Sequence, residues 1–272
     1  DSGIGVSVVV KMRSCNGVRY CRGKVEKCVS IACGTKMKML EDRCNSCGKD
    51  YCITRYEQAK KFGIYTGLAS AAKKGVCGDS HSFSGLENGR YMMLICDGMG
   101  NGGKARRESQ ATAALLENFF HAEFDETTIL NTINRLLILK SPDEMFSTVD
   151  MCVLDLIKGE MKFTKIGAPH SYIIRKQNAY PINAGALPIG ILDEFKPMVQ
   201  NRSIQDGDLI IMFSDGIADI EPNGEGADWI KDIVGTTKNP QVAADRILTA
   251  ALALGEQKDD MTIVAGRIAE NK

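Results

Sequence analysis

The sequence lacks any apolar run that approaches the ~20 residues of a membrane-spanning helix. It also lacks a charged-then-apolar leader of the secretory type. Because the chain begins with Asp1 rather than methionine, we expect it to be a fragment, and these absences say nothing about the parent protein. With 272 residues, 44% of them hydrophobic and 25% charged, the composition is that of a globular protein with a full core.

The sequence has no net charge, since 34 basic residues balance 34 acidic ones. The distribution is uneven: residues 1–76 carry 15 Lys and Arg against 6 Asp and Glu, and the remainder carries 19 against 28. The basic part could dock on the acidic part, face a phosphorylated partner or an anionic membrane, or simply be solvated. No basic helix with interleaved aromatic residues is present, so we expect no nucleic-acid binding.

Ten cysteines are many for this length, and seven of them fall between residues 15 and 52: Cys15, Cys21, Cys28, Cys33, Cys44, Cys47 and Cys52. Only Cys44 and Cys47 have metal-type spacing, and a structural zinc site needs a second such pair. Reduced thiols are therefore the leading interpretation, ahead of a structural metal and of disulfides. Cys77, Cys96 and Cys152 lie in apolar stretches and are expected in the core.

Short β-branched and apolar runs predict strands, among them Gly5 to Met12, one or two within Val25 to Leu40, and Arg90 to Cys96. Apolar residues at helical spacing predict two consecutive helices, about Ala105 to Phe120 and Glu126 to Leu139, the second capped by Asp125. A run of strands follows, including a hairpin turning at Lys158-Gly159 and a strand within Leu187 to Leu192. A final helix runs from Pro240 to Leu254, before a last strand, Met261 to Ile268. Strands without intervening helices favour antiparallel sheets and an α+β fold.

The stretch LICDGMGNGGKARRES, residues 94–109, permits three interpretations. Its glycines match the dinucleotide pattern G-x-G-x-x-G, but a second helix follows where a βαβ unit requires a strand. It also matches most of a phosphate loop, but Ala105 stands where Ser or Thr would hold Mg²⁺, and Asp97 would repel phosphates. The third interpretation is that Asp97 itself is the functional residue.

Asp97 is one of several carboxylates at strand ends. Asp97-Gly98 and Asp215-Gly216 each follow an apolar strand, Asp259 precedes one, and Asp79 lies in the sequence GDS. Carboxylates gathered in this way repel each other unless a cation neutralises them, and oxygen ligands suit Mg²⁺ or Mn²⁺. A glycine after the aspartate would let its backbone carbonyl approach the ion. The pattern predicts a metal site.

The ordered set GDS, DGMGNG, SDG and DDMT resembles the PP2C-type metal-dependent serine/threonine phosphatases, and more narrowly the phosphatase domain of the stage II sporulation protein E family. The spans TVDMCVLDL, Ile166 to Pro169 and Ala186 to Gly190 are also similar to that family. The resemblance covers about residues 64–268. It implies an α-β-β-α sandwich of two antiparallel sheets flanked by helix pairs, as residues 63–272, after a basic cysteine-rich segment, residues 1–62, that regulates or links.

The resemblance also implies a site. Two Mn²⁺ or Mg²⁺ ions would be bridged by Asp97, with the Gly98 carbonyl, Asp215 and Asp259 as further ligands and Asp79 acting through water. A metal-bound hydroxide held by Asp97, Asp215 and Asp259 would attack phosphorus in line. Met99 replaces the histidine of eukaryotic relatives, and only Lys73 and Lys74 stand near the usual place of the phosphate-binding arginine, so the general acid and the phosphate ligand stay open. His81, His121 and His170 match no catalytic position.

The family further implies a substrate and a form of control. The substrate would be a phosphorylated anti-sigma-factor antagonist, whose dephosphorylation activates a sporulation sigma factor, and the domain would be the cytoplasmic part of a membrane-anchored protein. Gly100, Gly102 and Gly103 would form a hinge through which the two following helices complete the metal site, after contact with a partner, the missing region or a second copy. The alternatives are a catalytically inactive metal-binding docking module and a nucleotide-binding regulator that uses Gly98 to Lys104.

Overall fold

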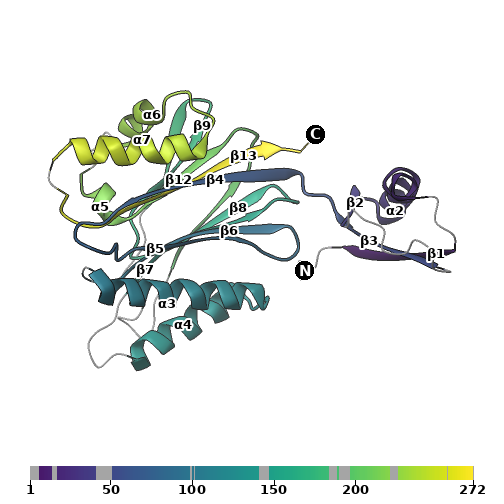
Figure 1. The fold of residues 1–272 in the computed structure, drawn as a ribbon, viewed down its shortest axis with the longest axis horizontal. Helices are drawn as coiled ribbons and strands as arrows, with labels where there is room; N and C mark the ends of the chain where they lie inside the picture. The colour runs from purple at the N-terminus through teal and green to yellow at the C-terminus, as the bar shows by residue number, and fades with distance from the viewer. Residues whose placement is uncertain are drawn as a thin grey trace. The chain divides into compact units, whose positions relative to one another are not determined.

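Figure 1 shows the chain as a computed structural model. The structure describes residues 6–13, 17–40, 51–98, 100, 102–140, 147–183, 189, 197–220, 226–255 and 257–271. The chain divides into two compact units, Asp1–Lys61 (unit 1) and Phe62–Lys272 (unit 2). Unit 2 starts one residue before the expected start of the phosphatase domain, and the regulatory or linking role of the preceding segment remains a prediction.

Unit 1 is a three-stranded antiparallel sheet with one helical segment on a single face. The sheet order is β1-β3-β2, with β1 at Ser7–Arg13, β3 at Tyr51–Gln58 and β2 at Met37–Met39. The helical segment is continuous from α1 (Val18–Tyr20) through the π-helix η1 (Cys21–Val25) to α2 (Glu26–Cys33). Along β3, Cys52, Thr54 and Tyr56 are buried while their neighbours are exposed, the alternation expected when one face packs against a helix.

The expectation of one or two strands within Val25 to Leu40 is wrong over most of that span. Helix α2 continues to Cys33, and Gly34 ends it with a φ of 65°, the left-handed conformation that glycine adopts at helix C-termini. Cys21, Val25 and Val29 recur every four residues and bury one side of the helix against the sheet. Only β2, at Met37–Met39, is a strand.

Unit 2 contains two five-stranded antiparallel sheets. The first, in the order β10-β9-β12-β13-β4, consists of β10 (Asn178–Ile182), β9 (Ser171–Arg175), β12 (Leu209–Phe213), β13 (Met261–Glu270) and β4 (Phe62–Ala71). The second, in the order β11-β8-β7-β6-β5, consists of β11 (Met198–Ser203), β8 (Glu160–Ile166), β7 (Ser147–Asp155), β6 (Arg90–Gly98) and β5 (Ser80–Gly85). We call them the β12 sheet and the β6 sheet.

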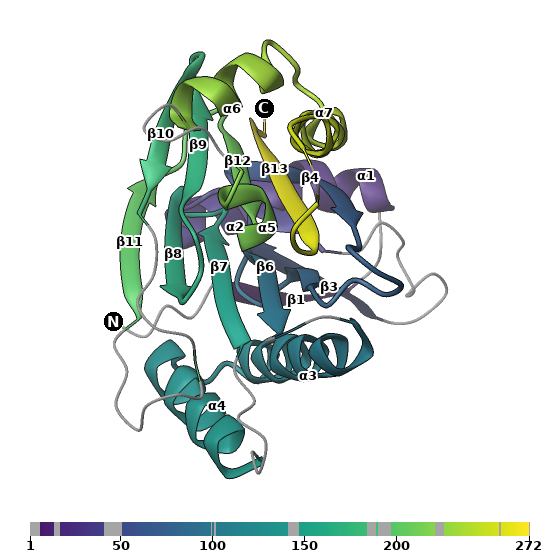
Figure 2. The ribbon, with the colours of Figure 1, turned by 90° about the vertical axis from the view of Figure 1, so that its left-hand side faces the viewer.

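Helices cover the outer face of each sheet, as Figure 1 and, turned by 90°, Figure 2 show. The helices on the β12 sheet are α6 (Gly226–Val234) and α7 (Pro240–Ala253), and those on the β6 sheet are α3 (Gly102–His121) and α4 (Glu126–Lys140). Three buried apolar clusters fill the spaces: one under α6 and α7, one between the sheets, and one under α3 and α4. The predicted α-β-β-α sandwich is confirmed.

Strand β6 shows why this layering follows from the sequence. Its residues Met92 to Cys96 are all buried, so it reads as a continuous apolar run rather than an alternating one. Met93 and Ile95 enter the cluster between the sheets, while Met92, Leu94 and Cys96 enter the cluster under α3 and α4. Because successive side chains of a strand point to opposite faces, only a strand covered on both sides is apolar throughout.

Most other predicted elements are confirmed. Helices α3 and α4 coincide with the two predicted helices, and the Asp125 carboxylate accepts a hydrogen bond from Thr128 N at 2.9 Å as an N-cap. Helix α7 starts at Pro240 after Asn239, whose side chain caps Gln241 N. Strands β3, β5, β10 and β11 were not predicted. Of the predicted strand Leu187 to Leu192 only Ile189, which bridges to Ser147, lies within the described residues. No helix of the described residues is long and apolar enough to cross a membrane.

Five of the cysteines within the described residues are free thiols: Cys28, Cys33, Cys77, Cys96 and Cys152. Cys96 and Cys152 are fully buried, as expected for core residues. Cys77 is not a core residue: it is half-buried in the loop between β4 and β5, where its Sγ lies 3.7 Å from the polar Thr262 Oγ1. Cys15, Cys44 and Cys47 lie outside the described residues, so the fate of the Cys44/Cys47 pair stays a prediction.

Candidate metal centre

Asp97 stands at the end of β6, where the sequence placed it. Its backbone is fixed by the neighbouring strand β7: Asp97 N donates to Thr148 Oγ1 at 3.3 Å, and Ser147 Oγ donates to the Asp97 carbonyl oxygen at 2.9 Å. The Asp97 side chain therefore lies at the end of the β6 sheet, on a backbone that hydrogen bonds to β7 hold in place.

Gly98 follows Asp97 because helix α3 passes directly over it. A Cβ on residue 98 would lie 2.2 Å from the carbonyl oxygen of Ala105 in α3, too close for any side chain. The same is true of Gly216 after Asp215, where a Cβ would lie 2.2 Å from the carbonyl oxygen of Asp260. Both Asp-Gly pairs thus have a packing reason for glycine that the sequence argument, based on approach of a metal, did not include.

Asp215 and Asp259 come from the other sheet. Asp215 begins the short helix α5 (Asp215–Ala218) immediately after β12, and Asp259 lies just before β13. Ser214 joins the two segments, since its backbone N donates to the Thr262 carbonyl at 2.9 Å and its hydroxyl accepts from Thr262 N at 2.9 Å. This double link fixes the start of α5 beside the start of β13.

Asp260, the neighbour of Asp259, has a structural role. Its carboxylate is buried and accepts hydrogen bonds from Lys73 N at 2.7 Å and Gly78 N at 2.5 Å, which fixes the loop between β4 and β5. Asp259 is only partly buried and acts electrostatically on Asp97 and Asp215. Of the two adjacent aspartates, Asp259 is therefore the one whose carboxylate remains available to a ligand.

Asp79 lies just before β5 and is held by helix α3. The Arg106 guanidinium donates to the Asp79 carbonyl, and Ser109 Oγ donates to the Gly78 carbonyl at 2.5 Å. Asp79 is buried, with 2% of the residue exposed, and neither of its carboxylate oxygens makes a hydrogen bond of normal geometry. Burial raises the pKa of this carboxyl group, while the hydroxyls of Thr262 and Ser214 favour its ionised form and lower its pKa. A buried, unpaired carboxylate is costly without a cation or a proton.

The four aspartates form one electrostatic group. Burial, followed by the charges of Asp79 and Asp215, raises the pKa of Asp97 to about 10. Burial and then the charges of Asp259 and Asp79 raise the pKa of Asp215, and burial raises that of Asp79. After burial, the charge of Asp79 is the largest cause of the raised pKa of Asp97, so the two carboxyl groups repel each other unless one is protonated or a cation is bound. In the absence of a cation, protons must neutralise the group.

The residues fit divalent cations in their chemistry, since buried carboxylates with an unpaired member are the donors that Mg²⁺ and Mn²⁺ select. The aspartate side chains are spaced more widely than the ligands of a single bound ion would be. Within the described part of the chain, no group of three or more His, Cys, Asp or Glu side chains is placed to hold one metal ion. An ion bound here would take the rest of its ligands from backbone carbonyls and water.

The predicted hinge glycines divide into two kinds. Gly100 and Gly102 have φ values of 90° and 75°, a conformation that other residues rarely adopt. Gly103 is the second residue of α3 and has open space around it, with only the end of the Arg107 side chain within 4 Å. Gly102 and Gly103 thus belong to the first turn of α3 rather than to a separate loop.

The three histidines have other surroundings. His121 Nε2 is hydrogen-bonded to Ser84 Oγ at 2.8 Å, and the His170 ring packs edge-on against Tyr172 and Phe213. Burial and Arg106 lower the pKa of His81. The side chains of Lys73 and Lys74 are exposed, and Met99 lies outside the described residues.

Sequence reasoning missed Arg106, Ser109, Thr148 and Asp260. Arg106 and Ser109 sit three residues apart on α3, the spacing of one helix face, but nothing in the sequence indicates that this face contacts Gly78 and Asp79. The antiparallel neighbours β5, β6 and β7 also exclude a dinucleotide-binding βαβ unit at the glycine-rich turn.

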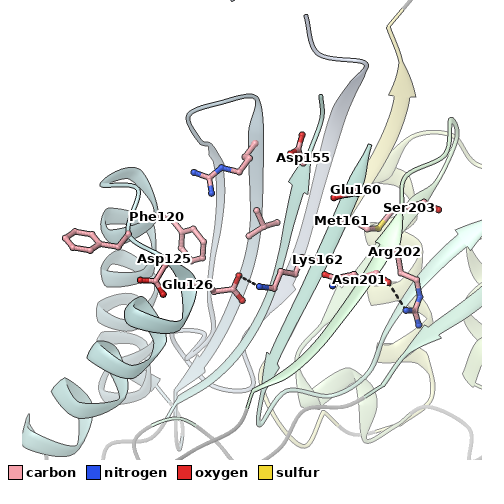
Figure 3. A pocket seen from close by; sticks show the side chains of 13 residues that line it. Phe120, Asp125, Glu126, Asp155, Glu160, Met161, Lys162, Asn201, Arg202 and Ser203 are labelled. Carbon is pink, nitrogen blue, oxygen red and sulfur yellow. Dashed lines mark hydrogen bonds and ion pairs between the residues drawn. The ribbon is translucent and has the colours of Figure 1, made fainter. Parts of the chain in front are cut away.

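A groove of about 620 Å³ lies at the opposite end of the β6 sheet (Figure 3). Its lining includes Arg90 at the start of β6 and Asp155 at the end of β7, which are opposite each other in the strand register. It also includes Glu126 of α4, which forms a 2.8 Å ion pair with Lys162 of β8. None of the predicted site residues lines it, so this groove is not the metal centre.

Comparison with known proteins gives the family. The family model "Stage II sporulation protein E (SpoIIE)" matches residues 87–269. The chain belongs to the stage II sporulation protein E family. The stage II sporulation protein E of Priestia megaterium is 36% identical over 267 residues, covering 93% of this chain and 46% of that protein. The protein of the same name from Bacillus subtilis (strain 168) is 38% identical over 228 residues, covering 81% and 28%.

A solved structure agrees. The PP2C phosphatase domain of SpoIIE from Bacillus subtilis, with a fragment of its regulatory domain, matches with a TM-score of 0.80 and 31% identity, covering all of this chain and 81% of that chain. The predicted type of domain, a PP2C-type serine/threonine phosphatase, is thereby confirmed. PP2C-type phosphatases are metal-dependent, and the link to sporulation comes from the SpoIIE family. The chain spans less than half the length of the two SpoIIE relatives, so activities and partners of the whole protein are proposals.

Proposed function

We propose that this SpoIIE domain hydrolyses phosphoserine or phosphothreonine in a protein, using two Mn²⁺ or Mg²⁺ ions. One observation carries the proposal: Asp79, Asp97, Asp215 and Asp259, from both sheets of the sandwich, form a group in which burial and mutual charge raise the pKa of Asp97 to about 10. Without a bound cation, this repulsion would only destabilise the folded domain. Asp97, the Gly98 carbonyl, Asp215 and Asp259 are the proposed direct ligands, with Asp79 acting through water.

Each residue has a separate task in this proposal. When bound, the ions would lower the pKa of a water molecule and neutralise the charge on the phosphoryl oxygens. Asp97 links the β6 sheet to the ions, and Asp215 and Asp259 link the β12 sheet to them. Thr148 and Ser214 hold the backbones on which Asp97 and Asp215 are carried. Asp260 holds the loop before Asp79, so that this carboxylate stays beside Asp97.

Helix α3 is the proposed switch of the site. It contacts the centre at two points: Ala105 lies against Gly98, and Arg106 with Ser109 holds Gly78 and Asp79. A small rotation of α3 at Gly100 and Gly102 would therefore move two parts of the centre at once. We propose that the isolated chain binds one ion weakly until a partner, a further part of the protein or self-association sets this helix.

The proposed substrate is a phosphorylated anti-sigma-factor antagonist, whose dephosphorylation would activate a sporulation sigma factor. The support is membership of the SpoIIE family, since no described residue identifies a partner. The parent protein is proposed to be membrane-anchored, with this domain in the cytoplasm. Specificity would appear as a kcat/KM for that antagonist far above the values for a panel of unrelated phosphoproteins, and equal values across the panel would exclude it.

The activity itself is tested by phosphate release from a phosphoserine protein with Mn²⁺, with Mg²⁺ and with a chelator. Hydrolysis only in the presence of a cation supports the proposal. Metal binding without hydrolysis would indicate an inactive docking module. Nucleotide binding that is retained in the chelator would indicate a nucleotide-binding regulator instead.

A further inference from the structure

A charged network lies inside the sandwich, between the two sheets. The Lys165 ammonium is 0% exposed and donates to Asp150 Oδ2 at 2.7 Å, to Ser171 Oγ at 2.8 Å and to the Pro169 carbonyl at 2.6 Å. Ser171 Oγ also donates to Asp150 Oδ2 at 2.7 Å. Asp150 and Lys165 belong to β7 and β8 of the β6 sheet, whereas Ser171 begins β9 of the β12 sheet. The network therefore joins the two sheets.

On one side the network lies next to the strand segment that carries Asp97. In the register of β6 and β7, Asp150 is opposite Ile95, and Thr148 is opposite Asp97. Asp150 and Thr148 are two residues apart and so point to the same face of β7. Thr148 is the residue whose hydroxyl accepts the Asp97 backbone N–H. On this face of β7, Asp150 is therefore the next residue after Thr148, which holds the Asp97 backbone.

On the other side the network reaches the segment that carries Asp215. Pro169 and Ser171, both bound by Lys165, flank His170. The His170 ring packs edge-on against Phe213, with 5.6 Å between ring centroids. Phe213 is the last residue of β12, two positions before Asp215. A continuous series of contacts therefore runs from Lys165 to the residues just before Asp215.

The energetics of such a network favour a role in geometry over one in net stability. Removing a lysine and an aspartate from water costs about as much as their attraction returns, and a well-packed apolar replacement is often as stable. Asp150 Oδ1 is buried and meets no hydrogen-bond partner among the described residues, so the pair is not even fully satisfied. What the network does fix is which part of the β12 sheet faces β7 and β8.

We propose that Lys165, with Asp150 and Ser171, is a positioning residue of the metal centre, which sets the spacing between the Asp97 end of one sheet and the Asp215 end of the other. This inference rests on the proposed metal centre. Since the ligands are divided between the sheets, a shift of one sheet past the other would change every distance that spans them. Lys165 touches neither substrate nor ion and acts only through the backbones it holds.

The test uses this chain with two perturbing variants and one control. The double variant Asp150→Leu/Lys165→Met replaces the network by apolar side chains. Ser171→Ala removes only the hydroxyl that joins Asp150 and Lys165 to β9, and leaves the bond from Lys165 to the Pro169 carbonyl in place. The control is Arg175→Met, which breaks the two 2.7 Å hydrogen bonds of Arg175 to buried Asp208, at the opposite end of β9. Each protein is measured for Mn²⁺ affinity by calorimetry, for Tm in chelator, for kcat and KM with p-nitrophenyl phosphate, and for amide exchange at residues 95–98 and 213–216.

The double variant is expected to keep a Tm near that of the wild type and to bind Mn²⁺ about tenfold more weakly or worse. Its kcat is expected to fall with little change in KM, and the backbone amides of residues 213–216 are expected to exchange their hydrogens faster. Ser171→Ala is expected to change the same quantities in the same direction. Arg175→Met is expected to lower Tm and to leave Mn²⁺ affinity unchanged. Wild-type affinity and exchange in both perturbing variants would overturn the positioning role. A wild-type chain that binds no Mn²⁺ would contradict the proposed function, and amide exchange would still decide the positioning role.

Discussion

The backbone of Gly98 lies against the carbonyl of Ala105, so closely that a Cβ on residue 98 would come within 2.2 Å of that oxygen. One contact thereby joins the end of β6, which carries Asp97, to the first turns of helix α3. Because the obstacle is backbone, it cannot move aside as a side chain would. The proposed metal centre and helix α3 are therefore in direct backbone contact at this point.

Gly98→Ala should therefore displace α3 or the end of β6. We expect a loss of stability on the order of 2 kcal/mol, the usual cost of overpacking, together with at least a tenfold loss of kcat. Chemical denaturation and steady-state kinetics measure the two effects. A variant with wild-type stability and kcat would show that the close approach is not maintained in solution.

The hinge glycines allow a matched comparison. Gly102→Ala forces a φ of 75° on alanine, at a cost of about 1 kcal/mol, and should change Mn²⁺ affinity and kcat together. Gly103→Ala has open space and should stabilise α3, by up to about 1 kcal/mol, with a smaller effect on metal binding. Calorimetric titration with Mn²⁺ decides: two tight sites in the wild-type chain, unaltered by either substitution, would exclude the switch.

Asp97→Asn should stabilise the metal-free protein at neutral pH. The folded-state pKa of about 10 lies above the ordinary value of 3.8, so the carboxyl group favours the folded state most below pH 4. That contribution declines as the pH rises towards 10. Asparagine carries no charge, and in chelator at pH 7.5 its Tm should exceed that of the wild type by about 3 °C or more. The difference should shrink towards pH 5, and a Tm difference that is independent of pH would contradict this assignment.

Asp259 and Asp260 should differ in kind. Asp259→Asn should weaken Mn²⁺ binding and lower kcat with little effect on stability, since Asp259 is partly buried and proposed to be a ligand. Asp260→Asn places an amide where two backbone N–H groups, those of Lys73 and Gly78, need acceptors, and should cost about 1 to 3 kcal/mol. Thermal denaturation in chelator separates the two. The reverse ranking of stability would exchange their roles.

The sequence predicted the parts of this molecule that depend on local pattern. The apolar strand before Asp97, the two helices after it, and the hairpin around Gly159, where φ is 80°, each have a short-range signal of periodicity or turn chemistry. The helical segment of unit 1 was missed because its β-branched residues and Gly34 are also typical of strands and turns. Its four-residue spacing becomes decisive only when the sheet that it covers is known.

The site was predictable as a set of aspartates but not as a structure. Asp97, Asp215, Asp259 and Asp79 were selected because each lies at a strand end in a short motif, and in the structure the four act on one another electrostatically. Their supports were not, because Thr148, Ser214 and Arg106 act through contacts between segments distant in the sequence. Lys165 and Asp150 illustrate the limit: both strands carry further charged residues, and only the register of β7 and β8 shows that these two side chains lie together.

The most direct measurement of the central claim is the kcat of Asp97→Asn at saturating Mn²⁺, with a phosphoserine protein as substrate and the wild-type chain beside it. The account predicts cation-dependent phosphate release by the wild type and no measurable turnover by the variant, because Asp97 is the carboxylate proposed to serve both ions. A variant that retains the wild-type kcat, or a wild type that is equally active in chelator, would contradict the assignment of this centre.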